Sequence, residues 1–214
     1  MRPVSRGRSL RVAIVAYGGV DEFDLAGALA PLTKAGDVLL PDVELKTDVV
    51  GPGPFRGSSG LLMTPDRTFA DLCDFAALDA VVLPGGKGAA TAAQDPALSG
   101  FVLGARAAGV PFYAVCSGVL ILRDLHLLNG LCVAIHGQKR QLLAESGCKL
   151  ESGVVRDQWL LSAGGFGPGD GPKGAEIAFH VLQDLAPDRV IAVANRMELW
   201  PQTNEQCVAA EYAS

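Results

Sequence analysis

Short runs of apolar residues alternate along the chain with longer segments whose apolar positions recur at helical spacing. The runs are rich in β-branched residues, which is typical of strands buried on both faces. The expected strands are residues 10–17, 43–50, 79–83, 110–115 and 131–135, and further extended segments are expected at 61–68 and 154–161. The expected helices are residues 23–35, 96–108, 119–128, 139–146, 175–185 and 188–197. Gly36 is expected to cap the first helix, and the segment 51–60, rich in glycine, proline and serine, is expected to be a loop.

The order of these elements predicts the fold class. Strands that alternate with helices form an α/β fold, with one doubly wound, mostly parallel sheet and helices on both faces. A chain of 214 residues is long enough to bury the core of one such domain, and no repeat or linker divides it. We therefore expect a single domain over residues 10–197, a flexible tail at 1–9 and a C-terminal extension at 198–214.

Composition and charge narrow the class of partner. Hydrophobic residues make up 49% of the chain and charged residues 19%, a balance typical of folded proteins. The net charge is -5 without a long basic run, which argues against binding of nucleic acid. No apolar run is long enough to span a membrane, and the basic start of the chain lacks a signal-peptide cleavage site. A cytoplasmic protein that acts on a small molecule is expected.

The cysteines and histidines show no metal-binding pattern. Five cysteines are present at irregular spacing, without a CxxC pair. An odd number of cysteines favours free thiols in a reducing compartment. The three histidines are scattered along the chain, and none lies at ligand spacing from a cysteine. No metal and no cofactor are therefore expected.

Three loops follow the carboxyl ends of expected strands, at residues 18–24, 84–86 and 116–118. In an open parallel sheet, ligands bind at this edge. The loops are therefore expected to meet and to form a site.

Cys116 lies on the turn between an expected strand and an expected helix. A turn of this kind resembles a nucleophile elbow, which exposes its nucleophile above the sheet. The start of the following helix is expected to favour the thiolate, and the N–H groups of Ser117 and of Gly85 or Gly86 are candidates for stabilising a developing negative charge. The alternative is that Cys116 is a small buried hydrophobe, as most free cysteines are.

Three acidic residues lie within four positions of the first loop. Asp21 and Glu22 are explained by a solvated helix start, where acidic side chains suit the helix dipole. Asp24 comes later and is placed to point at Cys116, where a carboxyl group can hold a proton or orient water.

Four segments in order resemble the ThiJ/PfpI superfamily, which has the class I glutamine amidotransferase-like, flavodoxin-like fold. The segments are DLAG at 24–27, VVLPGG at 81–86, AVCSG at 114–118 and LLNG at 127–130, the last leading through a strand to His136. The Cys-Ser-Gly form is most similar to the isonitrile hydratase branch, whose reaction converts an isonitrile and water to an N-substituted formamide. The resemblance implies Cys116 as nucleophile, Asp24 as acid/base, Ser117 in the place of the family's threonine, and a homodimer.

Two departures leave the substrate open. The motif at 24–27 continues as ALAP, without the family's usual proline and acidic residue, and the glycine-rich loop at 164–174 is longer than the family's turn. Phe166 in that loop and His136 are expected at the rim of the site. Another hydration, lyase or hydrolysis step in secondary metabolism, a glyoxalase or deglycase activity, and a non-catalytic ligand-sensing or redox-sensing role all stay open.

Overall fold

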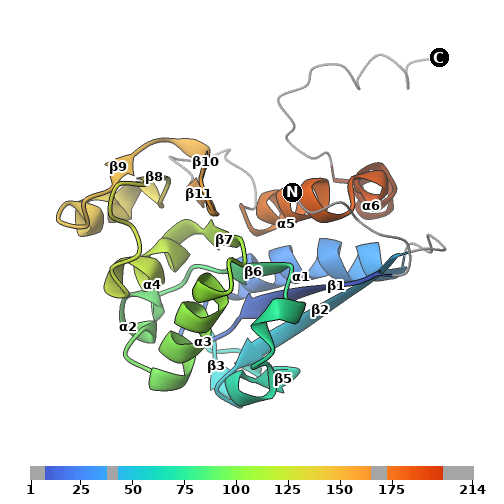
Figure 1. Cartoon of the computed structure of the whole chain (residues 1–214), viewed down its shortest axis with the longest axis horizontal. Helices are drawn as coiled ribbons and strands as arrows, with labels where there is room; N and C mark the ends of the chain where they lie inside the picture. The colour runs from blue at the N-terminus through green and yellow to red at the C-terminus, as the bar shows by residue number, and fades with distance from the viewer. Residues whose placement is uncertain (1–7, 38–42, 165–172, 200–214) are drawn as a thin grey trace.

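A seven-stranded sheet forms the centre of the protein, with the strand order β10-β11-β7-β6-β1-β2-β5 (Figure 1). The computed structural model describes residues 8–37, 43–164 and 173–199. The strands are β1 (Arg8–Val15), β2 (Val43–Gly51), β5 (Arg67–Thr68), β6 (Ala80–Leu83), β7 (Phe112–Val115), β10 (Gly153–Asp157) and β11 (Leu160–Gly164). Neighbouring strands are parallel, except for the antiparallel pair β10 and β11. This confirms the predicted mostly parallel sheet, and its five central strands follow the flavodoxin-like order.

Helices cover both faces of this sheet (Figure 1). Helices α1, α5 and α6 lie on one side, and α2, α3 and α4 lie on the other. Their bounds are α1 (Glu22–Asp37), α2 (Ala89–Ala92), α3 (Pro96–Ala107), α4 (Val119–Asp124), α5 (Lys173–Leu185) and α6 (Val190–Met197). Because both faces are covered, every residue of β6 and β7 is buried, which explains their unbroken apolar runs.

Helix α1 packs closely against α5 through two glycines. A Cβ atom on Gly174 would collide with the backbone carbonyl of Asp24, and one on Gly27 would lie 3.3 Å from the backbone nitrogen of Ala175. The absence of side chains at both positions therefore brings the start of α5 against the first turns of α1.

The first helix ends later than the sequence predicts. It passes through Gly36 and ends at Asp37, so the prediction that Gly36 caps it is wrong. A Cβ atom at Gly36 would lie 2.8 Å from the carbonyl oxygen of Leu45 on β2. This glycine lets the helix approach the sheet rather than stop.

Several short elements also differ from the sequence prediction. The extended segment expected at 154–161 is two strands, β10 and β11, joined by a tight turn in which Gln158 has a φ of 50°. The helix expected at 119–128 ends at Asp124, and that at 139–146 is a 3₁₀ helix, η4 (Gly137–Leu143). The remaining short strands are β3 (Phe55–Arg56), which lies inside the expected loop and pairs with β4 (Leu62–Met63), and β8 (Cys132–Val133), which pairs with β9 (Lys149–Leu150).

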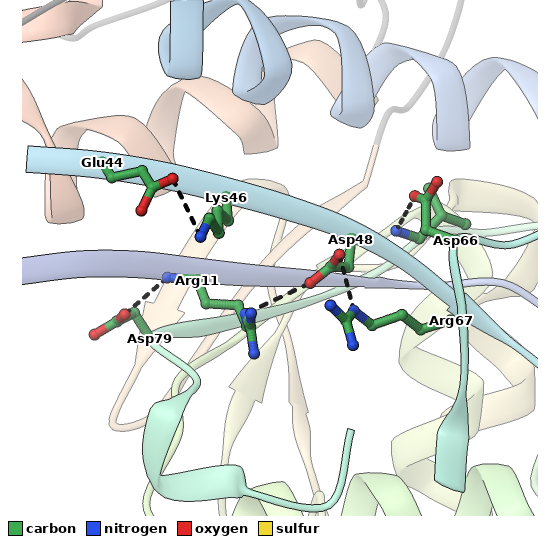
Figure 2. A network of polar contacts seen from close by, with 8 residues as sticks. Arg11, Glu44, Lys46, Asp48, Asp66, Arg67 and Asp79 are labelled. Atoms are coloured by element: carbon green, nitrogen blue, oxygen red, sulfur yellow. Dashed lines mark hydrogen bonds and ion pairs between the residues drawn. The ribbon is translucent and has the colours of Figure 1, made fainter. Parts of the chain in front are cut away.

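A polar network crosses strands β1 and β2 and reaches the loop before β6 (Figure 2). The backbone N–H of Arg11 donates to Asp79 at 2.9 Å, and the Arg11 side chain lies 3.5 Å from a carboxylate oxygen of Asp48. Arg67 on β5 contacts the other oxygen of Asp48 at 3.2 Å. These partly exposed ion pairs add little stability each, but together they tie the edge strand to the centre of the sheet.

In the described part of the chain, no helix is both long and apolar enough to cross a bilayer. The predicted tail at 1–9 and the extension at 198–214 lie largely outside the described residues.

Candidate active site

The three strand-end loops meet at the carboxyl edge of the sheet, as the sequence predicts. The backbone N–H of Gly85 donates to Oδ2 of Asp24 at 3.1 Å, and the N–H of Asp21 donates to the carbonyl of Gly85 at 2.8 Å. The N–H of Gly86 donates to Oγ of Ser117 at 2.9 Å. Strands β1 and β6 flank the topological switch point of the sheet, the place where ligands bind in folds of this class.

Gly85 lies between the carboxylate and the cysteine. A Cβ atom built on Gly85 would lie 2.7 Å from Oδ2 of Asp24, 2.8 Å from Cβ of Cys116 and 3.0 Å from the backbone nitrogen of Ser117. Because one point lies within 3 Å of both atoms, the Asp24 oxygen and the Cys116 Cβ are close neighbours across Gly85. Any side chain at position 85 would fill the space between the two groups.

Cys116 has a left-handed backbone conformation, with a φ of 55°. Few residues other than glycine adopt such a φ, and strained residues of this kind cluster at functional sites. Cys116 opens a short 3₁₀ turn, η3 (Cys116–Gly118), which leads directly into α4. This is the geometry of a nucleophile elbow.

The elbow needs glycine at position 118, because a Cβ atom there would collide with the carbonyl oxygen of Leu83 and lie 2.8 Å from that of Pro84. We expect Gly118→Ala to lower the free energy of unfolding by about 3 kcal/mol, because backbone atoms of β6 would have to move. Denaturant unfolding followed by circular dichroism measures the change.

The matched control is Gly100→Ala on α3, where a Cβ atom would meet nothing within 4 Å. This exposed helical position is expected to gain about 0.5–1 kcal/mol from the higher helix propensity of alanine. Equal unfolding free energies for the two variants would contradict the steric argument.

Asp24 is a buried acid, with only 9% of the residue exposed. Burial raises the pKa of Asp24 to about 6, with a further increase from the neighbouring Asp21 carboxylate, while the N–H of Gly85 opposes the shift. A carboxyl group with such a pKa is well matched to accepting and returning protons near neutral pH.

The N–H of Ser117 at the start of the helix favours the Cys116 thiolate, as the sequence predicts, but the expectation that Cys116 is therefore a thiolate is wrong. Burial and the negative charge of Asp24 raise the pKa of Cys116 to about 11, and the hydrogen bond from the backbone N–H of Ser117 opposes this only in part. Because α4 has only six residues, its dipole is a weak compensation. At neutral pH the pair is therefore a thiol beside a carboxylate, which share one proton.

Ser117 and Gly86 bond to each other rather than leaving free donors. Oγ of Ser117 accepts from the N–H of Gly86 and donates to its carbonyl, both at 2.9 Å. The N–H of Gly85 also donates to Asp24, so the N–H groups of both glycines already have acceptors within the site. The backbone N–H of Ser117 hydrogen-bonds to the Cys116 sulfur and lowers the pKa of the thiol.

Tyr17 is a part of the site that the sequence analysis missed. Tyr17 is only 3% exposed. Its hydroxyl lies 2.7 Å from the carbonyl oxygen of Pro84 and 2.9 Å from that of Gly85. Burial, followed by the charges of Asp24 and Cys116, raises its pKa well above the usual 10. A hydroxyl at the end of an otherwise apolar strand was the available signal.

The other acidic residues of the first loop have structural partners. Oδ1 of Asp21 accepts the N–H groups of Phe23 and Asp24 and so caps α1, as the sequence predicts. Glu22 instead accepts the N–H of Ser59 at 2.8 Å, which fastens the β3–β4 turn to the start of α1. Neither carboxylate is free to replace Asp24.

His136 caps the 3₁₀ helix η4, where its Nδ1 accepts the N–H of Gln138 at 3.3 Å. The preceding residue, Ile135, lies against Gly164 at the carboxyl end of β11, close to the strand edge that carries Cys116. The approach of the His136 side chain to the site stays a prediction. Phe166, the other predicted rim residue, lies outside the described residues.

Among the residues that the structure describes, no group of three or more His, Cys, Asp or Glu side chains is placed to hold a metal ion. The polar groups described at this edge are the thiol of Cys116, the carboxylate of Asp24, the hydroxyls of Tyr17 and Ser117, and backbone N–H groups.

The fold and the site together define a flavodoxin-like α/β protein with a cysteine on a strained strand-to-helix turn beside a buried carboxylate. The sequence pattern of the DJ-1/PfpI family matches residues 10–173, and the chain belongs to this family. Among curated proteins, the isonitrile hydratase of Pseudomonas putida is 29% identical over 178 residues, which cover 83% of this chain and 72% of that protein.

Solved structures show the same fold. A ThiJ/PfpI family protein from Pseudomonas syringae superposes with a TM-score of 0.75 at 24% identity, covering 96% of this chain and 81% of that chain. DJ-1beta of Drosophila melanogaster superposes with a TM-score of 0.74 at 24% identity, covering 90% and 99%.

Proposed function

We propose that this protein is an enzyme that hydrates isonitriles to N-substituted formamides, with Cys116 as nucleophile and Asp24 as acid/base. The observation that carries the proposal is the buried carboxylate of Asp24 beside the thiol of Cys116, with pKa values of about 6 and about 11. This arrangement supplies a nucleophile together with a base that can take its proton. Similarity to the isonitrile hydratase of Pseudomonas putida supports the choice of substrate.

In the first step, the sulfur of Cys116 bonds to the terminal carbon of the isonitrile while the S–H bond breaks. Asp24 accepts the thiol proton and delivers it to the same carbon. The intermediate is a thioimidate, in which the former isonitrile carbon carries one hydrogen, the sulfur and a double bond to nitrogen. The acid/base role requires Asp24 to be ionised at the start, as its pKa of about 6 allows at neutral pH.

Water completes the reaction. Its oxygen adds to the thioimidate carbon, and the nitrogen takes one proton through Asp24. The carbon–sulfur bond then breaks, and the hydroxyl proton passes to the sulfur through the same carboxylate. The formamide leaves, and the thiol and carboxylate of the resting enzyme are restored.

The experiment is a substrate panel. Aliphatic and aromatic isonitriles are incubated with the protein in water enriched in oxygen-18, and formamide is measured by mass spectrometry. One labelled oxygen per formamide is expected. Glyoxal and methylglyoxal form a second arm, which tests the glyoxalase alternative. Turnover of the dicarbonyls without turnover of any isonitrile would overturn the proposal.

A homodimer in the cytoplasm is part of the same proposal, on the strength of the family resemblance. Light scattering coupled to size exclusion chromatography measures the mass in solution, and a monomeric mass would contradict the dimer.

A further inference from the structure

The hydroxyl of Tyr17 reaches two consecutive carbonyls of the turn after β6. It lies 2.7 Å from the carbonyl oxygen of Pro84 and 2.9 Å from that of Gly85. Both groups are buried, so a donor at this point is worth more than it would be in water. Nothing in the thiol–carboxylate chemistry proposed above uses this hydroxyl.

These two carbonyls belong to the same peptide units whose N–H groups face the site. The Pro84 carbonyl shares its peptide plane with the N–H of Gly85, which donates to Asp24 at 3.1 Å. The Gly85 carbonyl shares its plane with the N–H of Gly86, which donates to Ser117 at 2.9 Å. Because a peptide unit is planar and trans, holding its carbonyl in place also fixes the direction of its N–H.

The two peptide planes do not depend on Tyr17 equally. The Gly85 carbonyl also accepts the N–H of Asp21 at 2.8 Å, so this second plane has another anchor. The Tyr17 hydroxyl therefore acts mainly on the peptide unit between Pro84 and Gly85, and so on the hydrogen bond from the Gly85 N–H to Asp24.

We propose that Tyr17 is a positioning residue that aims the Gly85 N–H at Asp24 and so stabilises the carboxylate form of this acid. A hydrogen bond to a charged carboxylate favours its ionised form. Accepting a bond from Tyr17 also polarises the peptide, which makes its N–H a better donor. The inference rests on the acid/base role proposed for Asp24, and it assigns to Tyr17 the setting of the pH at which that acid ionises.

The titratable groups that face Asp24 come from three elements of the described structure. Asp21 lies directly before α1, the helix that carries Asp24. Cys116 lies on η3, and Tyr17 lies two residues after the end of β1. On α5, which packs against the other side of α1, Lys173 and Glu176 pair with each other at 2.6 Å. Of these groups, only Tyr17 acts on Asp24 through a peptide bond rather than through its charge.

The test follows the rate at which iodoacetamide alkylates Cys116, measured on the Cys116 peptide by mass spectrometry as a function of pH. This rate has an inflection at the pKa of Asp24, because ionisation of the carboxylate raises the pKa of the neighbouring thiol. The assay needs no isonitrile, so a failure of the proposed reaction would leave its outcome unchanged.

In Tyr17→Phe the inflection is expected to move upward by about half a pH unit or more. The matched control is Tyr113→Phe, which removes another buried phenol, on β7, the strand on the far side of β6 from β1. That hydroxyl donates to Asp184 at 2.5 Å, and the inflection is expected to stay at the wild-type pH. An unchanged inflection in Tyr17→Phe, or an equal shift in both variants, would overturn the inference.

A second replacement guards against misfolding. Incorporation of 3-fluorotyrosine at position 17 keeps the shape and the hydroxyl but makes the phenol a stronger donor. The inflection is then expected to move to lower pH, opposite to the shift in Tyr17→Phe. A merely structural role for Tyr17 predicts no movement here, and that result would also overturn the proposal.

Discussion

Replacement of Cys116 by serine is expected to reduce isonitrile turnover by ~10³-fold or more. Serine preserves the volume of the side chain and its position on the elbow, whose φ of 55° is set by the turn. Its hydroxyl is far less acidic than the thiol, so a carboxylate with a pKa of about 6 cannot take its proton efficiently. Initial rates of formamide formation at pH 7.5 give the comparison.

The control for this prediction is Cys132→Ser, which changes a half-buried free thiol on β8. Its turnover is expected to match that of the wild type. If Cys116→Ser kept the wild-type rate, covalent catalysis by this residue would be excluded. If Cys132→Ser lost as much activity, the effect could not be assigned to the elbow.

Replacement of Asp24 by asparagine is expected to slow isonitrile turnover by ~10²–10⁴-fold, the usual contribution of a general acid/base. The amide oxygen can still accept the N–H of Gly85, so the local geometry is preserved. In the wild type, kcat/KM is expected to fall below about pH 6, because a protonated Asp24 cannot accept the thiol proton. In Asp24→Asn this limb of the pH profile is expected to disappear.

The same variant is expected to make Cys116 more reactive towards iodoacetamide. The charge of Asp24 raises the pKa of the thiol, so its removal lowers that pKa and increases the fraction of thiolate at pH 8. Turnover and alkylation thus change in opposite directions. A variant that lost both would point to damage of the elbow rather than to loss of a base.

Asp24 also links the stability of the protein to pH. Its pKa rises from the ordinary 3.8 to about 6 on folding, so its contribution to stability is fully present below pH 3.8 and is lost as the pH rises through 6. The loss amounts to about 3 kcal/mol, from the free energy that corresponds to this pKa shift. Asp24→Asn avoids it, so its gain in unfolding free energy over wild type is expected at pH 8 and absent at pH 3.5. Urea unfolding at both pH values measures the difference. An equal gain in unfolding free energy at pH 3.5 and pH 8 would contradict the destabilising effect of the buried Asp24 charge.

The position of the site could be predicted from the sequence because it depends on strand ends. Asp24, Gly85 and Cys116 each follow a buried apolar run, and a parallel sheet brings such ends to one edge. The place of Tyr17 at the end of an apolar run could be seen in the sequence, but its contacts could not, because they are hydrogen bonds to carbonyls 67 and 68 residues away.

Electrostatics and short elements were the other limits of sequence reasoning. A helix start predicted a thiolate at Cys116, but burial and the charge of Asp24 outweigh a six-residue helix. The segment at 154–161 was expected to be one extended unit, because a turn at Gln158 carries no glycine to mark it. Both errors arise where tertiary contacts override a local pattern.

The close approach of Gly27 and Gly174 has a consequence for how the site can diverge between relatives. Helix α5 begins at Lys173, where the match to the family pattern ends, yet its second residue lies against the backbone carbonyl of Asp24. Substitutions at or beside Gly174 can therefore move the Asp24 backbone from behind the site. A change in the packing of α5 against α1 can therefore alter the position of Asp24 while the turn that carries Cys116 stays the same.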